Sequence, residues 1–172
     1  MFIKIFSQII NVFGTLFNII GINSNNKNNT LLYFAIGNIF IAIALGLLKA
    51  YAGMTIQIIF VIQAFVNYFL EKKKIKYSIW LALIYIIVPC VILIINFDTY
   101  WDILPIIGAI IYPLVILSKE FVLRALNLIS VIIWIPYNFH FGQYVGTISC
   151  IFFAITNLIA IYRFDIVKNN KK

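Results

Sequence analysis

Residues 31–70 read LLYFAIGNIFIAIALGLLKAYAGMTIQIIFVIQAFVNYFL, a run of forty positions with a single charged side chain, Lys49. As one helix this run would be about 60 Å long at ~1.5 Å per residue, about twice the thickness of the hydrocarbon core of a bilayer. The chain must therefore turn inside the run, and the segment KAYAG at 49–53 is the place where it can do so. The run predicts two membrane-spanning helices joined by a very short turn.

Outward from this run, the sequence predicts an all-α protein, a polytopic helical bundle in a membrane. The 172 residues are 64% hydrophobic and 10% charged, too little polar surface to cover a water-soluble globule. A second tight hairpin is expected at 138–142, where Pro136 and Gly142 weaken the helix on either side. Seven transmembrane spans are expected, of which the fifth is the shortest, at residues 3–22, 31–48, 51–70, 77–95, 103–118, 121–138 and 143–162.

The basic residues lie at the ends of apolar runs, a pattern typical of topology signals and not of nucleic-acid binding. We therefore expect the N-terminus outside and the C-terminus inside, which leaves only Lys4 and Lys49 on the outer side. The cluster at 72–76 could also hold anionic lipid headgroups, although orientation alone explains it. The residues expected inside are Lys27, Lys72, Lys73, Lys74, Lys76, Lys119, Arg124, Arg163, Lys168, Lys171 and Lys172.

A repeat is expected within the single integral membrane domain at 1–172. It consists of a first three-helix unit at 1–70, a linking helix with its loops at 71–102, a second three-helix unit at 103–163, and a cytoplasmic tail at 164–172. The pairs that suggest the repeat are Gly14 with Gly108, Asn38 with Asn127, Gly53 with Gly142, and Asn67 with Asn157. One linking helix allows two three-helix units to lie parallel, and parallel repeats commonly place a substrate site between them.

The carboxyl-terminal half contains LPIIG at 104–108, WIPYNF at 134–139 and GT at 146–147, together with Arg124, Gly142, Asn157 and Arg163. This series resembles the family of bacterial inner membrane proteins typified by YgjV. The layout of three, one and three spans also resembles the SWEET, PQ-loop and PnuC-type transporters. The resemblance implies a multi-pass protein of the bacterial inner membrane that moves a metabolite. The chain departs from these patterns in having no Pro-Gln dipeptide, and in having Cys150 where an acidic residue is expected.

The inventory of reactive side chains argues against an enzyme. His140 lies at a turn, the two cysteines are in apolar segments without a CxxC pattern, and no metal or cofactor is expected. Ion coupling is not expected either, because no charge lies in a span interior and Lys49 and Arg124 are close enough to span ends to snorkel. The acidic residues are all at span ends or in loops: Glu71, Asp98, Asp102, Glu120 and Asp165.

The candidate site is polar but uncharged. Trp134 and Asn138 are four residues apart on one helical face, and Asn127 lies seven residues before Trp134 on the same face. Carboxamides in lipid need partners, so they should point into the bundle, where they either bond helices together or line a solute cavity. The predicted substrate-binding residues are Trp134, Asn138, Asn157, Asn127, Asn67 and Asn38, joined by Asn11, Asn18, Gln57, Gln63, Thr147 and Ser149.

Two functional classes follow from this site. The first is an uncoupled facilitator of a small uncharged metabolite, which is sugar-, nucleoside- or vitamin-like, with Pro105, Pro113 and Pro136 as hinges. The second is a non-transporting membrane scaffold or assembly protein, in which the interface between helices is filled. The lipid bilayer is the expected partner, and the sequence leaves a homo-oligomer open.

Overall fold

The computed structural model describes residues 2–76, 78–95, 97–117 and 120–167, and every regular element within these ranges is a helix. A 3₁₀ turn, η1 (Tyr100–Asp102), precedes the fifth α-helix, and a short π-helical segment, η2 (Tyr162–Val167), follows the seventh. The predicted all-α architecture is confirmed. The seven α-helices of the described chain are α1 (Phe2–Ile22), α2 (Lys27–Leu47), α3 (Tyr51–Lys72), α4 (Ile79–Ile95), α5 (Ile103–Leu117), α6 (Glu120–His140) and α7 (Tyr144–Ile161).

Two helix boundaries differ from the expected ones for local reasons. α2 begins at Lys27 and not at residue 31, because the side chain of Asn26 accepts a hydrogen bond from the backbone nitrogen of Asn28 at 2.9 Å and caps the helix. α6 continues through Pro136 to His140, two residues beyond the expected end at 138. Both predicted hairpin turns are present, between α2 and α3 and between α6 and α7.

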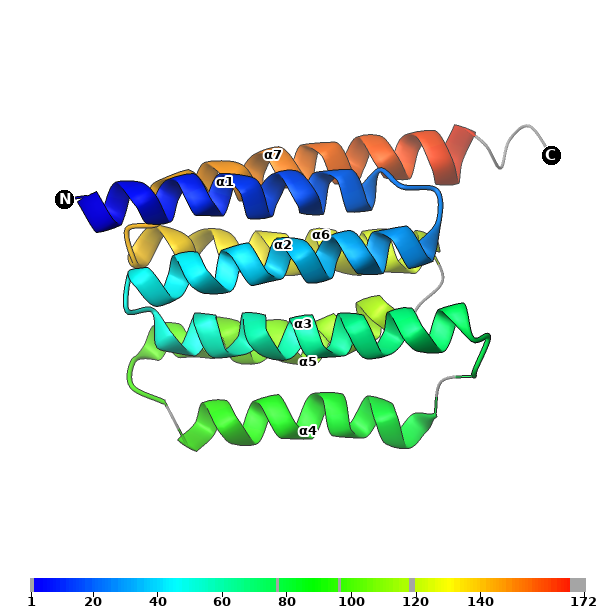
Figure 1. Ribbon diagram of the computed structural model, residues 1–172, viewed down its shortest axis with the longest axis horizontal. Helices are drawn as coiled ribbons and strands as arrows, with labels where there is room; N and C mark the ends of the chain where they lie inside the picture. The colour runs from blue at the N-terminus through cyan, green and yellow to red at the C-terminus, as the bar shows by residue number, and fades with distance from the viewer. Residues whose placement is uncertain (1, 77, 96, 118–119, 168–172) are drawn as a thin grey trace.

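Six of the helices form a closed ring of two layers (Figure 1). α1, α2 and α3 make one layer, and α7, α6 and α5 make the other, with α2 and α6 in the middle. The ring closes because α1 packs against α7 at one edge and α3 packs against α5 at the other. α4 lies outside the ring, against α5 and α3. The chain begins at one end of the bundle, called here the N-terminal end, and α7 finishes at the opposite, C-terminal end.

Five helices are long and apolar enough to cross a membrane: α1, α2, α3, α6 and the continuous segment Tyr144–Ile166. α4, with 17 residues, and α5, with 15, are shorter. At ~1.5 Å per residue they extend about 25 Å and about 22 Å, below the ~30 Å of a typical hydrocarbon core. The outer faces carry exposed large apolar side chains such as Ile62, Ile94 and Phe152, which fit a lipid bilayer.

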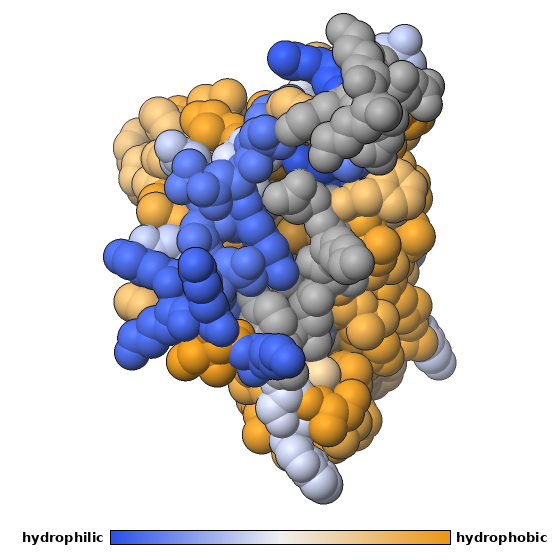
Figure 2. Space-filling view, turned by 90° about the vertical axis from the view of Figure 1, so that its right-hand side faces the viewer, coloured by the Kyte–Doolittle hydropathy of each residue, from blue (hydrophilic) through white to orange (hydrophobic). Residues whose placement is uncertain are grey.

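Charged groups gather at the C-terminal end of the bundle. Figure 2 looks onto this end, where a hydrophilic area is flanked by hydrophobic sides. Lys72, Lys73, Lys74 and Lys76 are exposed there, and the ammonium of Lys27 lies 3.3 Å from a carboxylate oxygen of Glu71. Lys4 and Lys49 lie towards the other end. Four lysines counted in the orientation argument, Lys119, Lys168, Lys171 and Lys172, lie outside the described residues.

The two short turns at the N-terminal end have the same backbone geometry. Lys49 (φ 61) and Gly142 (φ 70) are left-handed, and each is followed by a residue with φ near −80 and ψ near 60 that precedes the next helix. In both turns the hydrogen bonds are those of a Schellman motif: the Ala50 nitrogen donates to the Leu45 carbonyl, and the Gln143 nitrogen donates to the Asn138 carbonyl. One turn has glycine at the left-handed position and the other has lysine.

α1 and α2 approach each other closely at a pair of glycines. A Cβ on Gly14 would lie 2.8 Å from the carbonyl oxygen of Gly37, and a Cβ on Gly37 would lie 2.8 Å from that of Gly14. Only residues without a side chain allow this backbone approach, which is a common way to pack helices in lipid. The close contact brings the polar face of α1 next to the centre of α2.

We predict that Lys49→Gly raises the unfolding temperature of the purified protein in detergent. Glycine adopts a positive φ without the roughly 1 kcal/mol cost that a Cβ adds, and the exposed Lys49 side chain should lose little. Gly142→Ala should lower the unfolding temperature for the same reason. A lower unfolding temperature for Lys49→Gly would show that the lysine side chain makes a contact worth more than the backbone strain.

Candidate functional site

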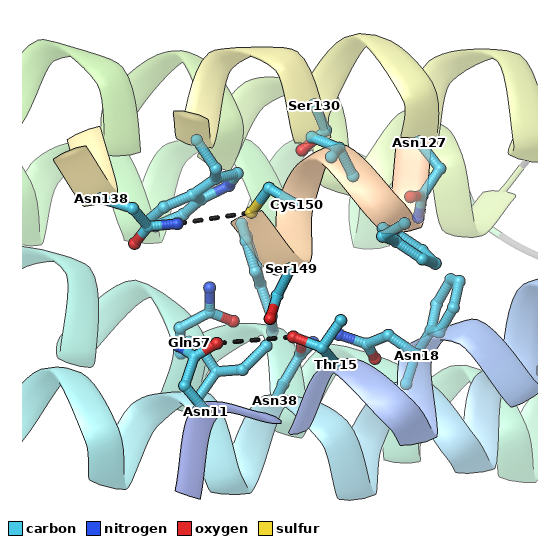
Figure 3. Close-up of a pocket in the computed structure, with 16 residues that line it drawn as sticks. Asn11, Thr15, Asn18, Asn38, Gln57, Asn127, Ser130, Asn138, Ser149 and Cys150 are labelled. Atoms are coloured by element: carbon cyan, nitrogen blue, oxygen red, sulfur yellow. Dashed lines mark hydrogen bonds between the residues drawn. The ribbon is translucent and has the colours of Figure 1, made fainter. Parts of the chain in front are cut away.

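A cavity of about 80 Å³ with both polar and apolar walls lies inside the ring, between α1, α2 and α3 on one side and α6 and α7 on the other (Figure 3). Its lining residues lie in the inner turns of these helices, except for Asn138, which is two residues before the end of α6. Its polar lining consists of Asn11, Thr15, Asn18, Asn38, Gln57, Asn127, Ser130, Asn138 and Ser149, and its other walls are Phe34, Ile41, Phe60, Val131, Trp134, Cys150 and Phe153.

Three of the lining carboxamides are buried and only partly hydrogen-bonded. Gln57 and Asn127 are 6% exposed and Asn138 is 5% exposed, yet their side-chain oxygens have no hydrogen-bond partner among the described residues. The amide nitrogen of Asn138 donates only to the sulfur of Cys150, at 3.4 Å, which is a weak acceptor. The oxygen of Asn18, which is less buried, also lacks a partner. The cavity therefore offers several unused acceptors, from α1 and α3 of one layer and from α6 of the other.

Aromatic rings fix the shape of the cavity. Trp134 meets Tyr137 edge to face, with ring centroids 5.3 Å apart, and the nitrogen edge of its indole packs near Gly108 of α5. Phe34 of α2 and Phe153 of α7 meet edge to face with centroids 6.4 Å apart. These contacts hold rigid apolar surfaces on both layers of the ring, so a solute in the cavity would have rings on either side.

Four of the six predicted site residues come together at this cavity: Asn38, Asn127, Trp134 and Asn138. The other two, Asn67 and Asn157, are buried but lie outside it. The amide nitrogen of Asn67 donates to the Gln63 carbonyl at 2.6 Å and to the Tyr85 hydroxyl at 3.3 Å, towards α4. The amide nitrogen of Asn157 donates to the Arg124 carbonyl at 2.9 Å and bonds α7 to α6. These two amides connect helices.

Residues outside the main prediction also line the cavity. These residues are Thr15, Ser130 and Cys150. Helical spacing from a predicted residue could have identified Thr15 and Ser130. Thr15 lies four residues after Asn11 on α1, with its hydroxyl 3.4 Å from the Asn11 side-chain oxygen, and Ser130 lies three residues after Asn127 on α6. Cys150 is the cysteine that stands where the family resemblance expects an acidic residue, whereas Cys90 lies on α4, outside the cavity.

Among the hinge candidates, Pro113 and Pro136 are inside α5 and α6, whereas Pro105 is in the first turn of α5. Proline in a first turn removes no helical hydrogen bond, so the argument for a hinge applies to Pro113 and Pro136. Within the described residues, no group of three or more His, Cys, Asp or Glu side chains could hold a metal ion.

The N-terminal end of the ring is closed by hydrogen bonds between the layers. The Gly53 nitrogen donates to the hydroxyl of the fully buried Tyr137 at 2.9 Å, which joins α3 to α6. The Gln8 side chain accepts from the Val145 nitrogen at 3.0 Å and donates to the Gly142 carbonyl at 3.3 Å, which joins α1 to the start of α7. Opening this end would require these bonds to break.

An ion pair occupies the C-terminal end, and it corrects the expectation that Arg124 snorkels. Arg124 is 3% exposed, and one guanidinium nitrogen lies 3.1 Å from both carboxylate oxygens of Asp165. A second nitrogen donates to the Ser24 carbonyl, in the loop between α1 and α2, at 3.4 Å. Arg124 therefore connects α6 to η2 and to the other layer of the ring.

We predict that Asp165→Asn destabilises the protein by about 3–5 kcal/mol, because a buried guanidinium is left without its counter-charge. Combining Arg124→Met with Asp165→Leu should restore much of the stability, because both charges are then gone. Thermal unfolding in detergent measures both. As a control, Lys27→Met breaks the more exposed Lys27–Glu71 pair and should cost less than about 1 kcal/mol. An Asp165→Asn protein as stable as the wild type would refute this role.

The comparisons with known proteins give one match. No curated protein and no solved structure matches the chain, so the wider likeness to SWEET, PQ-loop and PnuC-type transporters has no relative to support it. The family Imp-YgjV, described as bacterial inner membrane protein, matches residues 5–168, which is nearly the whole chain. The family expected from the carboxyl-terminal half is confirmed, together with the location in the bacterial inner membrane. The chain belongs to the Imp-YgjV family of bacterial inner membrane proteins.

Proposed function

We propose that this protein is an uncoupled facilitator, which lets a small uncharged metabolite cross the bacterial inner membrane through the cavity inside the helix ring. The observation that carries the proposal is that three buried carboxamides, Gln57, Asn127 and Asn138, line one cavity with side-chain oxygens that lack partners within the described chain. Each unpaired buried acceptor costs about 1–3 kcal/mol. A bound solute, or water in its place, supplies the missing donors.

The rival function, a scaffold whose helices only pack, predicts a different use of such residues. In a scaffold the amides should bond across helix contacts, as Asn157 does to α6 and Gln63 does to the Tyr85 carbonyl of α4, at 3.1 Å. The side-chain oxygens of Asn157 and Gln63 also lack partners among the described residues, so the cavity amides differ from these two in that they surround a space. The protein thus contains both kinds of amide, and the cavity favours transport over a purely structural role.

The proposal of uncoupled movement rests on the chemistry of the lining. Every residue given above as part of the cavity is uncharged at neutral pH. Proton- and sodium-driven transporters commonly use carboxylates or histidines in the membrane to couple ion and solute movement. The buried ion pair of Arg124 and Asp165 lies at the C-terminal end, where it connects elements of the ring. Movement down a concentration gradient is the mode that this lining supports.

A two-unit organisation is part of the proposal, with a register that differs from the pairs suggested by the sequence. α2 and α6 each have 21 residues and begin at Lys27 and Glu120, and α3 and α7 begin at Tyr51 and Tyr144. Each pair is 93 positions apart (144 − 51 = 93), as are the left-handed turn residues Lys49 and Gly142. In this register Gly53 corresponds to Gly146 and Phe60 to Phe153, and both phenylalanines line the cavity.

The directions of the helices and the positions of the lysines also support the proposed topology. Because α1, α3, α5 and α7 run the same way, the two three-helix units are parallel, with α1 and α5 at opposite corners of the ring. The exposed lysines at the C-terminal end favour a cytoplasmic position for that end, and hence an external N-terminus. Two parallel units around a central cavity could then open it to either side by rocking, with Pro113 and Pro136 as the flexible points.

The test is solute permeation into proteoliposomes, followed by stopped-flow light scattering after a hyperosmotic step with each of a panel of sugars, nucleosides and vitamin-like compounds. We predict faster reswelling than in protein-free liposomes for at least one solute. Asn138→Ala should reduce that rate at least about tenfold, since it removes a hydrogen-bonding group in the cavity worth ~1.4 kcal/mol or more.

The matched control is Asn23→Ala, which also removes a carboxamide. The Asn23 side chain bonds to the Ile19 carbonyl of its own helix, at 2.9 Å, and lies at the end of α1 away from the cavity. This variant should keep the wild-type rate. No accelerated permeation of any solute by protein that elutes as a folded species would refute the proposed function.

A further inference from the structure

We infer that the solute is a short-chain polyol, of three or four carbons, held by its hydroxyl protons against the carboxamide oxygens of the cavity. This inference rests on the proposed function and narrows it, because it excludes nucleosides, larger sugars and charged solutes. It draws on three separate properties of the cavity: which polar atoms are unused, what charge surrounds them, and how much room there is.

The unused polar atoms are acceptors. The side-chain oxygens of Gln57, Asn127 and Asn138 are buried without a partner among the described residues. Gln57 lies on α3, and Asn127 and Asn138 lie on different turns of α6. A ligand must therefore bring hydrogen-bond donors to at least three separate points. An ether, an ester or a hydrocarbon cannot do this, whereas a polyol has one donor on each carbon.

The ligand must also accept hydrogen bonds. Among the described residues, the Asn138 amide nitrogen has only the Cys150 sulfur as an acceptor, and the hydroxyls of Ser130 and Ser149 in the lining can donate. An ammonium group donates but cannot accept, so it would leave these donors unused. A hydroxyl group does both, which is the combination that the lining requires.

The charge near the cavity favours a neutral ligand. A cation would be buried without a counter-charge, because no carboxylate is among the lining residues, and the charged group next along α6 is the guanidinium of Arg124. An anion would face the oxygens of the carboxamides, which repel it. A neutral polyol avoids both costs.

The size of the cavity favours a small ligand. A buried water requires roughly 10–15 Å³ in the same measure, so about 80 Å³ holds about five to eight atoms of that size. This number matches the non-hydrogen atoms of a three- or four-carbon polyol. A nucleoside or a hexose is larger. The ring faces of Phe34, Phe60 and Phe153 then contact the carbon-bound hydrogens.

The inference is tested by size and charge selectivity in the reswelling assay. Erythritol, which crosses lipid slowly, is compared with mannitol, uridine, choline chloride and sodium lactate in the same proteoliposomes. We expect accelerated reswelling with erythritol and rates equal to those of protein-free liposomes with the other four. Gln57→Leu and Asn127→Leu, which remove acceptors at nearly constant size, should each slow erythritol at least about tenfold.

A binding measurement shows whether the solute occupies the cavity, independently of its transport. Trp134 is the cavity tryptophan, and Trp80→Phe together with Trp101→Phe leaves it as the sole indole in the chain. Erythritol should change its fluorescence in a saturable manner, and uridine should not. Asn23→Ala in this background serves as the control and should bind erythritol as before.

The outcomes distinguish the two proposals. Accelerated uridine or mannitol entry without erythritol entry would leave the facilitator standing and overturn the polyol inference. Erythritol entry that is unchanged in both Gln57→Leu and Asn127→Leu would also overturn it, because the acceptors would then not contact the solute. If no solute enters and erythritol leaves the Trp134 fluorescence unchanged, both proposals fail.

Discussion

The need of a buried carboxamide for hydrogen-bond partners governs this structure. In lipid there is no water to satisfy an amide, so each one must find a partner within the protein or in a cavity. The molecule uses both solutions. Asn157 bonds α7 to α6 within the ring and Asn67 bonds α3 to α4 outside it, whereas Asn127 and Asn138 surround a space at the centre of the ring. The same residue type thus serves as a link between helices at some positions and as a polar wall at others.

The ring makes this division possible. α2 and α6 lie in the middle of their layers, and the close contact of Gly14 with Gly37 brings the polar stripe of α1 towards them. Across the two layers the ring of Phe153 meets that of Phe34 edge to face, and Trp134 packs against Tyr137 of its own helix beside the cavity. In the proposed register the amides are not symmetric: Asn127 corresponds to Phe34, and Gln57 to Cys150. An asymmetric lining would hold an asymmetric ligand in one orientation.

The sequence predicts the fold better than the site. Apolar run length and the turn at Lys49 are local signals, and they locate the seven helices and both tight hairpins. The burial of the amides is also predictable, since lipid excludes them. Which interface each amide meets depends on helix rotation and on the placement of α4, and no local pattern encodes these. For this reason Asn67 bonds to Tyr85 of α4 instead of lining the cavity. Arg124 was expected to reach water, but it forms an ion pair with Asp165, which lies beyond the end of α7.

The closure of the ring between α1 and α7 has a consequence for biogenesis. Gln8 and Asn11 make up a polar face that is covered only when the last helix arrives, because Gln8 bonds to Val145 and Asn11 lies against Gly146. Their neighbour Ser7 already bonds to the Ala44 carbonyl of α2. During synthesis the first helix is inserted while its final neighbour is still being translated. Until then its polar face must be shielded by the insertion machinery or by neighbouring helices. A chain truncated before residue 144 would leave that face exposed to lipid, a mark by which membrane proteases could recognise unfinished copies.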